Sequence, residues 1–181
     1  MLRLIDAEET YLAGYKEAYL LSLQEIEKGT IKKHDLMFDD PEKVDIIQKY
    51  KDSRDRSKLK PKYVPSYDYF FVDDDKFIGR ISIRTELTPA LLNYGGNIGY
   101  GINPKYWKMG YGTMLLKLGL EKAKELVLQD QVLVTCDDDN IGSYKIIEKN
   151  GGILENKVEN IDEGETFLTR RYWIKIRRTD I

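Results

Sequence analysis

The chain has one cysteine, Cys136, among its 181 residues. A single cysteine excludes an internal disulfide framework and a cysteine-rich zinc site, and it suits a reducing compartment. Apolar runs fall far short of the roughly 20 residues that a membrane-spanning helix needs, and the opening MLRLIDAEET has no apolar centre of a signal peptide. We therefore expect a cytoplasmic protein with no membrane contact and no metal site.

An excess of charge of one sign is also lacking, because the formal net charge is −2. That balance excludes a global attraction to nucleic acid or anionic lipid. The run Lys49 to Lys62 could dock on a nucleic acid, but such a run is more often a solvated helix end and loop, so we expect no nucleic-acid partner. The only histidine, His34, lies in a polar connection and is expected to be exposed. The length favours a single domain over residues 1–181.

The stretch Asn97 to Gly112, NIGYGINPKYWKMGYG, carries the densest pattern in the chain. Its first half alternates larger side chains with glycine, which predicts a strand with one nearly bare face that a ligand or another backbone can approach. After Pro104, the order Gly-Tyr-Gly-Thr leads into MLLKLGLEKAKEL. The free N–H groups of that helix start, at the end of a strand, favour a bound phosphate.

Two common phosphate motifs do not fit this turn. A dinucleotide fingerprint needs a third glycine where Leu115 stands, and the Gly-Lys-Ser/Thr of a P-loop is absent. The turn instead resembles the pyrophosphate loop of the GNAT acetyltransferase superfamily, Arg/Gln-x-x-Gly-x-Gly/Ala. Gly110 and Gly112 match that pattern, whereas Trp107 replaces the Arg or Gln. The alternative is a βαβ unit with ordinary turn glycines.

Two later segments strengthen the resemblance. VLVTCDDDN (Val132 to Asn140) and SYKIIEKNGG (Ser143 to Gly152) are similar to the family's next strand, its Asn-led helix and its terminal glycine. GRISIRTEL, YGGNIGYGI, NGGILEN and RRYWI resemble a branch known only as predicted acetyltransferases. Asn97 stands where that branch has histidine, and Trp107 where it has arginine.

Periodicity and turn signals place the other elements. We expect a helix over 11–28, a second helix opened by Asp39 to Pro41, a β-hairpin over 67–87, a loop over 88–96, helices after Gly112 and over 140–149, and last strands over 153–158 and 167–176. The resemblance implies an α/β (α+β) fold: a mixed, mostly antiparallel sheet of about seven strands with a V-shaped splay, flanked by about four helices.

The resemblance also implies acetyl-CoA as cofactor. Backbone groups of the central strand would pair with the pantetheine arm, and N–H groups of the glycine turn would bind the pyrophosphate. The residues expected to hold the cofactor are Tyr100, Ile102, Lys108, Met109, Gly110, Tyr111, Gly112, Thr113, Asn140 and Ser143. For Asn140, a plain helix N-cap is an equal alternative.

Acetyl transfer to an amine also needs a base. Glu86, near the end of the hairpin strand, is the first candidate, and a surface carboxylate is the alternative. His34, Asp137 and Tyr69 are weaker candidates. Cys136, on a buried strand, is expected to be inert.

The acid that protonates the leaving thiolate is a tyrosine in many members of the family. Its position here is Ile147, so Ser143 or Tyr144, one turn earlier, would substitute.

The leading hypothesis is an acetyl-CoA-dependent N-acetyltransferase that acts on a primary amine of an unknown small molecule or peptide, by direct attack in a ternary complex. The alternative is a non-catalytic acyl-CoA-binding regulatory protein with the same fold. Several tyrosines and Glu86 would suit a cationic acceptor, although such tyrosines are more often sheet surface and core. The sequence leaves open whether the chain forms a homodimer.

Overall fold

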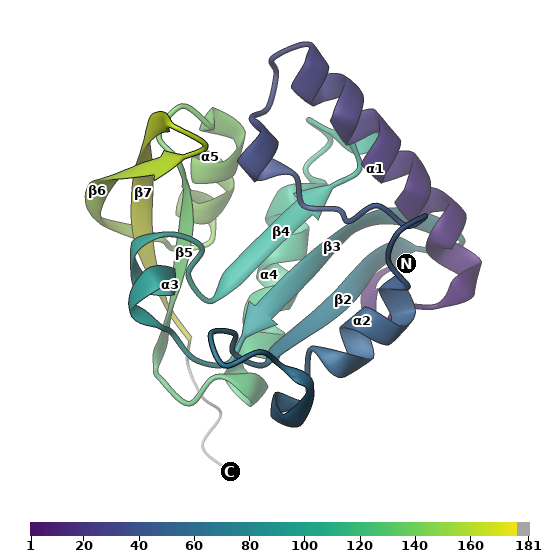
Figure 1. Ribbon diagram of the computed structural model, residues 1–181, viewed down its shortest axis with the longest axis horizontal. Helices are drawn as coiled ribbons and strands as arrows, with labels where there is room; N and C mark the ends of the chain where they lie inside the picture. Colours follow the sequence, from purple (N-terminus) through teal and green to yellow (C-terminus); the bar gives the residue numbers. More distant parts are fainter. Residues whose placement is uncertain (177–181) are drawn as a thin grey trace.

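A single seven-stranded sheet organises the computed structural model, which describes residues 1–176. Its order is β1-β2-β3-β4-β5-β7-β6 (Figure 1). The strands are β1 (Leu2–Ile5), β2 (Ser66–Asp73), β3 (Lys76–Arg84), β4 (Ile98–Ile102), β5 (Gln131–Asp137), β6 (Ile153–Asp162) and β7 (Glu165–Lys175). The helices are α1 (Leu12–Glu27), α2 (Ile46–Asp52), α3 (Pro89–Asn93), α4 (Tyr111–Leu126) and α5 (Ile141–Lys149). The predicted fold class is confirmed.

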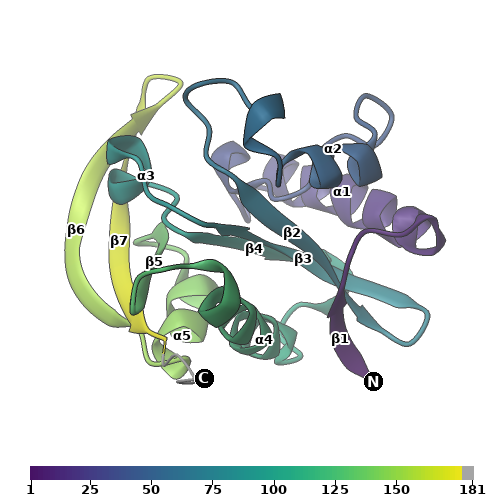
Figure 2. The same ribbon diagram turned by 90° about the horizontal axis from the view of Figure 1, so that it is seen from below.

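Helices cover both faces of the sheet, with α1 and α2 on one side and α4 and α5 on the other (Figure 2). The α1 side has an aromatic core in which Tyr15 packs against Phe38, Phe70 and Phe77 with ring centroids 5.5–5.6 Å apart. On the α4 side the predicted apolar stripe is buried: Leu116, Leu120, Ala123 and Val127. The helical period of 3.6 residues therefore placed this helix correctly against the sheet.

The sheet opens between β4 and β5, as the V-shaped splay predicted. These two strands run parallel and pair only at Ile98 and Val134, and they diverge beyond that point (Figure 1). On its other edge β4 pairs with β3 from Ile98 to Ile102. The Asn97 carbonyl accepts from the Arg84 N–H, and the Asn103 N–H donates to the Ile78 carbonyl. Because antiparallel pairing alternates, the backbone groups of Tyr100 and Ile102 face the opening instead.

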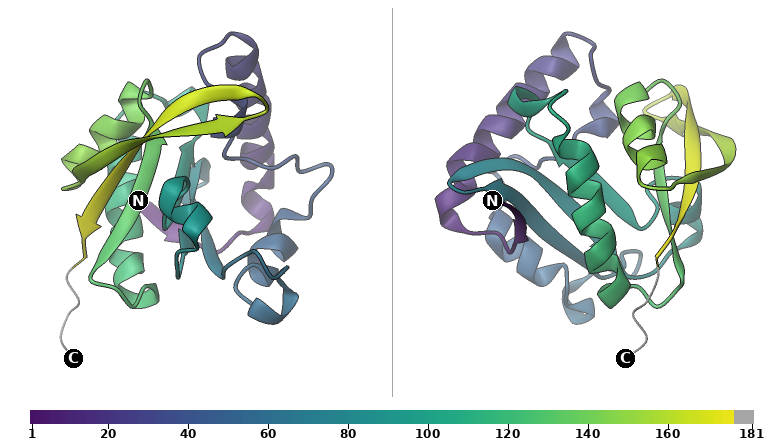
Figure 3. Two further views of the ribbon diagram at one scale, coloured as in Figure 1. Left: turned by 60° about the vertical axis from the view of Figure 1, so that its left-hand side comes forward. Right: turned by 180° about the vertical axis from the view of Figure 1, so that it is seen from behind.

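The hairpin of β6 and β7 curves toward the connection that follows α1 (Figure 3). At its tip, the carboxylate of Glu163 lies 2.8 Å from Lys33 Nζ. Farther along, the ring of Phe167 stacks on His34 with centroids 4.2 Å apart. Residues more than 100 positions apart in the chain therefore form one wall beside the opening.

Three expected boundaries differ in the structure. The second helix begins at Ile46, where the Asp45 side chain accepts from the Gln48 N–H, and not at Asp39, whose N–H donates to the Tyr15 hydroxyl. The expected loop over 88–96 contains the short helix α3, capped by Thr88. The strand β6 extends to Asp162, beyond the predicted end at Val158. Within residues 1–176, no helix has the length and apolarity to cross a bilayer.

Candidate active site

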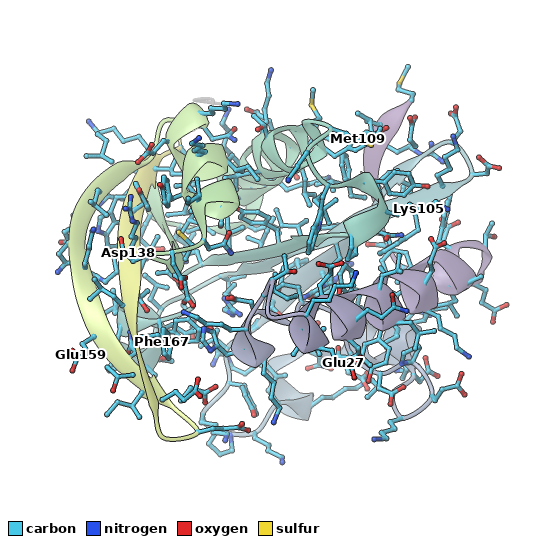
Figure 4. The ribbon with its side chains drawn as sticks, turned by 90° about the horizontal axis from the view of Figure 1, so that it is seen from above. Glu27, Lys105, Met109, Asp138, Glu159 and Phe167 are labelled. Carbon is cyan, nitrogen blue, oxygen red and sulfur yellow. The ribbon has the colours of Figure 1, made fainter. Side chains whose placement is uncertain are left out.

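A cavity of about 320 Å³ lies at the opening between β4 and β5. Its walls come from β4, the start of α5, the loop before α4 and the connection after α1; they include Thr30, Asp35, Tyr100, Ile102, Trp107, Lys108, Asn140 and Ser143. Figure 4 looks onto this region, with Asp138 and Phe167 on the β5 and β7 side and Lys105 and Met109 near the start of α4. Five of the ten residues expected to hold the cofactor line this cavity: Tyr100, Ile102, Lys108, Asn140 and Ser143.

The start of α4 is shaped by two left-handed residues, Lys108 (φ 61°) and Gly110 (φ 84°). The Gly110 carbonyl accepts from the Met114 N–H, so the N–H groups of Tyr111, Gly112 and Thr113 precede the first helical hydrogen bond and have no partner within the helix. Lys108 and Met109 are exposed beside them. This helix end therefore offers donors and the positive end of the dipole to an anion.

Gly112 has a second, steric role. A Cβ at this position would clash with the Cδ1 atom of Ile146 on α5. Glycine therefore allows α4 and α5 to approach closely on the same side of the sheet. At Gly110 a Cβ would meet nothing, and there the left-handed backbone is what favours glycine.

Trp107 occupies the position where the family has Arg or Gln, and its side chain holds two segments of the site together. Its indole N–H donates to the Ile102 carbonyl at 3.0 Å. The side chain therefore ties the loop before α4 to the end of β4, without supplying the cation that the family pattern has. The Ile102 N–H and both backbone groups of Tyr100 still face the opening.

Two of the predicted residues meet across the opening. The hydroxyls of Tyr100 and Ser143 lie 2.9 Å apart, and burial raises the pKa of Tyr100. The Ser143 N–H donates to the Asn140 side chain, which confirms Asn140 as the N-cap of α5 while it also lines the cavity. Ser143 and Tyr100 thus place two hydroxyls on the cavity wall.

Tyr144 and Cys136 do not line the cavity. The guanidinium of Arg170 covers the Tyr144 ring at 3.9 Å. Cys136 is buried, and burial raises the pKa of its thiol to about 12. A thiol with that pKa is protonated at neutral pH, as expected for inert filling.

His34 is not exposed, contrary to the prediction. Only 12% of its side chain is accessible, and its Nε2 atom lies 2.8 Å from Oδ2 of Asp137. Asp137 is almost fully buried, and its Oδ1 atom has no partner within the described residues. Lys32 Nζ lies 3.1 Å from Oδ2 of Asp137. The sequence showed His34 in a polar loop and gave no sign that this loop folds back onto the end of β5.

Asp35, which sequence reasoning did not single out, belongs to the same group. It lines the cavity with Tyr100 and Ser143. Burial and the Asp137 carboxylate raise its pKa to about 6. One potential metal-ligating atom from each of His34, Asp35 and Asp137 lies within 4.8 Å of the other two. The positive charge beside Asp137 is, however, already supplied by the Lys32 ammonium. The group is therefore suited to proton exchange.

Glu86 and Tyr69 lie elsewhere. Glu86 is exposed just beyond β3, and its Oε1 atom accepts from Arg56 at 2.7 Å. It lines neither the cavity at the opening nor the second, larger cavity described below. The Tyr69 ring lies against the cations of Arg54 and Lys122. Of the expected bases, only His34 and Asp137 lie beside the cavity at the opening, where they contact the lining residue Asp35 without lining the cavity themselves.

The larger cavity, about 950 Å³, lies between α2 and β2 and β3. It shares two lining residues, Met37 and Phe38, with the cavity at the opening. The predicted bare face of β4 forms part of the boundary, because Met37 packs over both glycines: Cβ atoms at Gly99 and Gly101 would lie 3.0 and 2.6 Å from it. The close approach that the glycines predicted is therefore made by this segment of the chain itself.

Comparison with known proteins places this geometry in a family. The model of the acetyltransferase (GNAT) domain family matches residues 22–153. No curated protein sequence matches the chain.

Three of the solved structures with the same fold share 15–17% identity with this chain. RimL, a ribosomal L7/L12 alpha-N-protein acetyltransferase, superposes with a TM-score of 0.70 at 16% identity, covering 97% of this chain and 90% of that chain. The microcin C7 self immunity acetyltransferase MccE, in complex with acetyl-CoA and AMP, gives 0.68 at 17% identity, covering 97% and 92%. A GNAT-family acetyltransferase from Streptococcus pneumoniae gives 0.61 at 15% identity, covering 98% and 100%. These likenesses show the fold, and because the family model spans well over half of the sequence, the chain belongs to the GNAT acetyltransferase family.

Proposed function

We propose that the protein transfers an acetyl group to a primary amine of a small molecule or a peptide, by direct attack of the amine in a ternary complex. Family membership confirms the predicted enzyme class and its acyl donor, acetyl-CoA. The observation that carries the proposal is the open edge of β4 beside the free start of α4, with the Asp35 carboxylate on the same cavity wall.

The chain fits the donor in two places. Both backbone groups of Tyr100 face the opening and are suited to the amides of a pantetheine arm, whereas the Ile102 carbonyl is taken by Trp107. The N–H groups that begin α4, with Lys108 beside them, are suited to a pyrophosphate. Bound acetyl-CoA supplies a thioester that is already activated, so the protein needs no nucleophile of its own. Its contribution is to position the amine and to handle protons.

Asp35 takes the role of general base that the sequence assigned first to Glu86. An amine is mostly protonated at neutral pH, and a base works best when its pKa is near the working pH. The raised pKa of Asp35, about 6, meets that requirement. Asp137, held by His34 and Lys32, keeps a second negative charge near Asp35 and so helps to raise its pKa.

The hydroxyls of Tyr100 and Ser143 provide the proton for the departing thiolate. They are in contact with each other and both line the cavity, so a proton that one of them gives to the thiolate can be replaced through the other by a proton from solvent. Tyr144, the other residue expected for this role, is covered by Arg170. The Ile102 N–H, which faces the same opening, is a donor for the developing oxyanion.

A thiol-release screen tests the proposal. Polyamines, amino acids, aminoglycosides and peptide N-termini are each incubated with acetyl-CoA and the protein, and free coenzyme A thiol is measured. The proposal expects release with at least one class, and loss of that release in Asp35→Asn. Stabilisation by acetyl-CoA without thiol release from any amine would instead support the non-catalytic acyl-CoA-binding alternative.

A further inference from the structure

We infer that the 950 Å³ cavity between α2 and β3 binds the acceptor, and that Arg84 there selects an amine which also carries a carboxylate. The inference rests on the proposed function and extends it to the substrate class. It starts from the charges around this cavity, which are not balanced once each ion pair is assigned.

Arg84 is a partly buried cation with no anionic partner. Its Nη1 atom donates to the carbonyls of Gly95 and Gly96, both at 3.0 Å. Within residues 1–176 no carboxylate lies within ion-pair distance of it, and its Nη2 atom makes no hydrogen bond. Burial and the neighbouring Arg80 lower its pKa. A desolvated guanidinium is costly without an anion, and its planar fork matches a carboxylate.

The carboxylates around the same cavity are already neutralised. Asp39 pairs with Lys49 and Asp52 with Lys58, each at 2.7 Å. Asp68 binds the guanidinium of Arg80 and accepts from two serines. The unbalanced charge of the cavity is therefore positive.

A second unpaired cation adds to this charge. Lys62 lines the cavity, and its only described contact is with the ring of Tyr63. This charge favours an anionic group on the acceptor and argues against the purely cationic acceptor that the tyrosines and Glu86 would suit.

The position of Arg84 relates this charge to the reaction. A Cβ at Gly99 would lie 3.8 Å from Nη2 of Arg84, so the guanidinium reaches β4 one residue before Tyr100, where the open edge begins. Met37, whose Cε atom lies 3.0 Å from that Cβ position, borders both cavities there. A carboxylate bound to Arg84 would therefore hold the acceptor beside β4, on the side from which its amine has to reach the opening. An amino acid or a short peptide carries both groups.

Paired ligands test the inference without any variant. Amino acids and short peptides are titrated calorimetrically into the acetyl-CoA-loaded protein, each beside its own neutral carboxamide. A hydrogen-bonded charge pair predicts that the acid of the best pair binds at least about tenfold more tightly than its amide. Phosphoethanolamine beside ethanolamine is the comparison for a phosphate.

Arg84→Gln is the matching variant and Arg56→Gln its control. Arg84→Gln should reduce the preference for the acid to less than about threefold, whereas Arg56→Gln removes the same charge from an exposed site outside the cavity and should keep the preference. Equal binding of acids and amides, binding of neither, a stronger preference for the phosphate, or an unchanged preference in Arg84→Gln would each overturn the inference.

Thiol release by the same preparations separates this inference from the proposed function. Release with neutral amines but without preference for acids would overturn the carboxylate site alone. Tight binding of acids without release from any amine would support a carboxylate site at Arg84 and overturn the transferase proposal.

Discussion

Tyr100 on β4 and Ser143 on α5 join their hydroxyls, 2.9 Å apart, across the opening of the sheet. The contact spans the place where β4 and β5 no longer pair. The two hydroxyls that we expect to protonate the leaving thiolate therefore also connect β4 to α5.

Tyr100→Phe should lower kcat by about a hundredfold or more, in the range seen when a proton donor is lost. The affinity for acetyl-CoA should change little, because backbone groups of residue 100 would bind the donor. Steady-state kinetics and direct titration of acetyl-CoA measure the two quantities separately. Tyr144→Phe is the control and should keep kcat, since Arg170 covers that ring; equal losses in both variants would refute the assignment.

Asp35→Asn should reduce kcat by about a hundredfold or more, because it removes the base while keeping the shape of the side chain. In the unchanged protein kcat/KM should rise with pH and reach half of its limit near pH 6, since Asp35 must be ionised to accept a proton. The matched control is Glu86→Gln, which removes an exposed carboxylate paired with Arg56 and should alter kcat less than about twofold. If the two variants exchanged these effects, Glu86 would be the base, as first expected from the sequence.

Asp35→Asn should also stabilise the fold. The pKa of Asp35 is higher in the folded protein than in the unfolded chain, so the folded state binds the extra proton and stability falls as pH rises from about 4 through 6. Above that range the ionised carboxylate is unfavourable in place. Asp35→Asn should therefore raise the free energy of unfolding at pH 7.5 by about 1–2 kcal/mol. The gain should vanish near pH 4, and denaturant melts at the two pH values measure it.

Gly112→Ala should lower Tm by several degrees, because the added Cβ meets Cδ1 of Ile146. Ile146→Val removes that methyl group. The double variant should therefore recover most of the lost stability, and the recovery in a double-mutant cycle is the measurement. A loss in Gly112→Ala that Ile146→Val does not relieve would mean that glycine is needed there for another reason, such as backbone access to a phosphate.

The sequence predicted the elements whose signal is local. The stripe Leu116 to Val127 marked α4, the glycines of β4 marked a close approach, and Gly110 and Gly112 marked a turn that leads into a helix. These features depend on residues a few positions apart, so periodicity and backbone preference are enough to read them.

The proton-handling group was not visible in the same way. His34 and Asp137 are 103 positions apart and meet only because the connection after α1 folds over the end of β5. The raised pKa of Asp35 comes from that burial and from Asp137, and neither cause is written in the residues beside it. Glu86 was predicted to face the cleft but lies outside it, since a polar residue at a strand end gives no sign of which way it faces.

The two cavities share only Met37 and Phe38 among their lining residues. Apart from Arg84, which holds the carbonyls of Gly95 and Gly96 just before β4, substitutions around the rest of the larger cavity can therefore accumulate with little effect on the glycine turn. During divergence, a lineage with this architecture could change the compound it modifies while its coenzyme stays the same. Positions 37 and 38 would be the exception, where one replacement alters both halves at once.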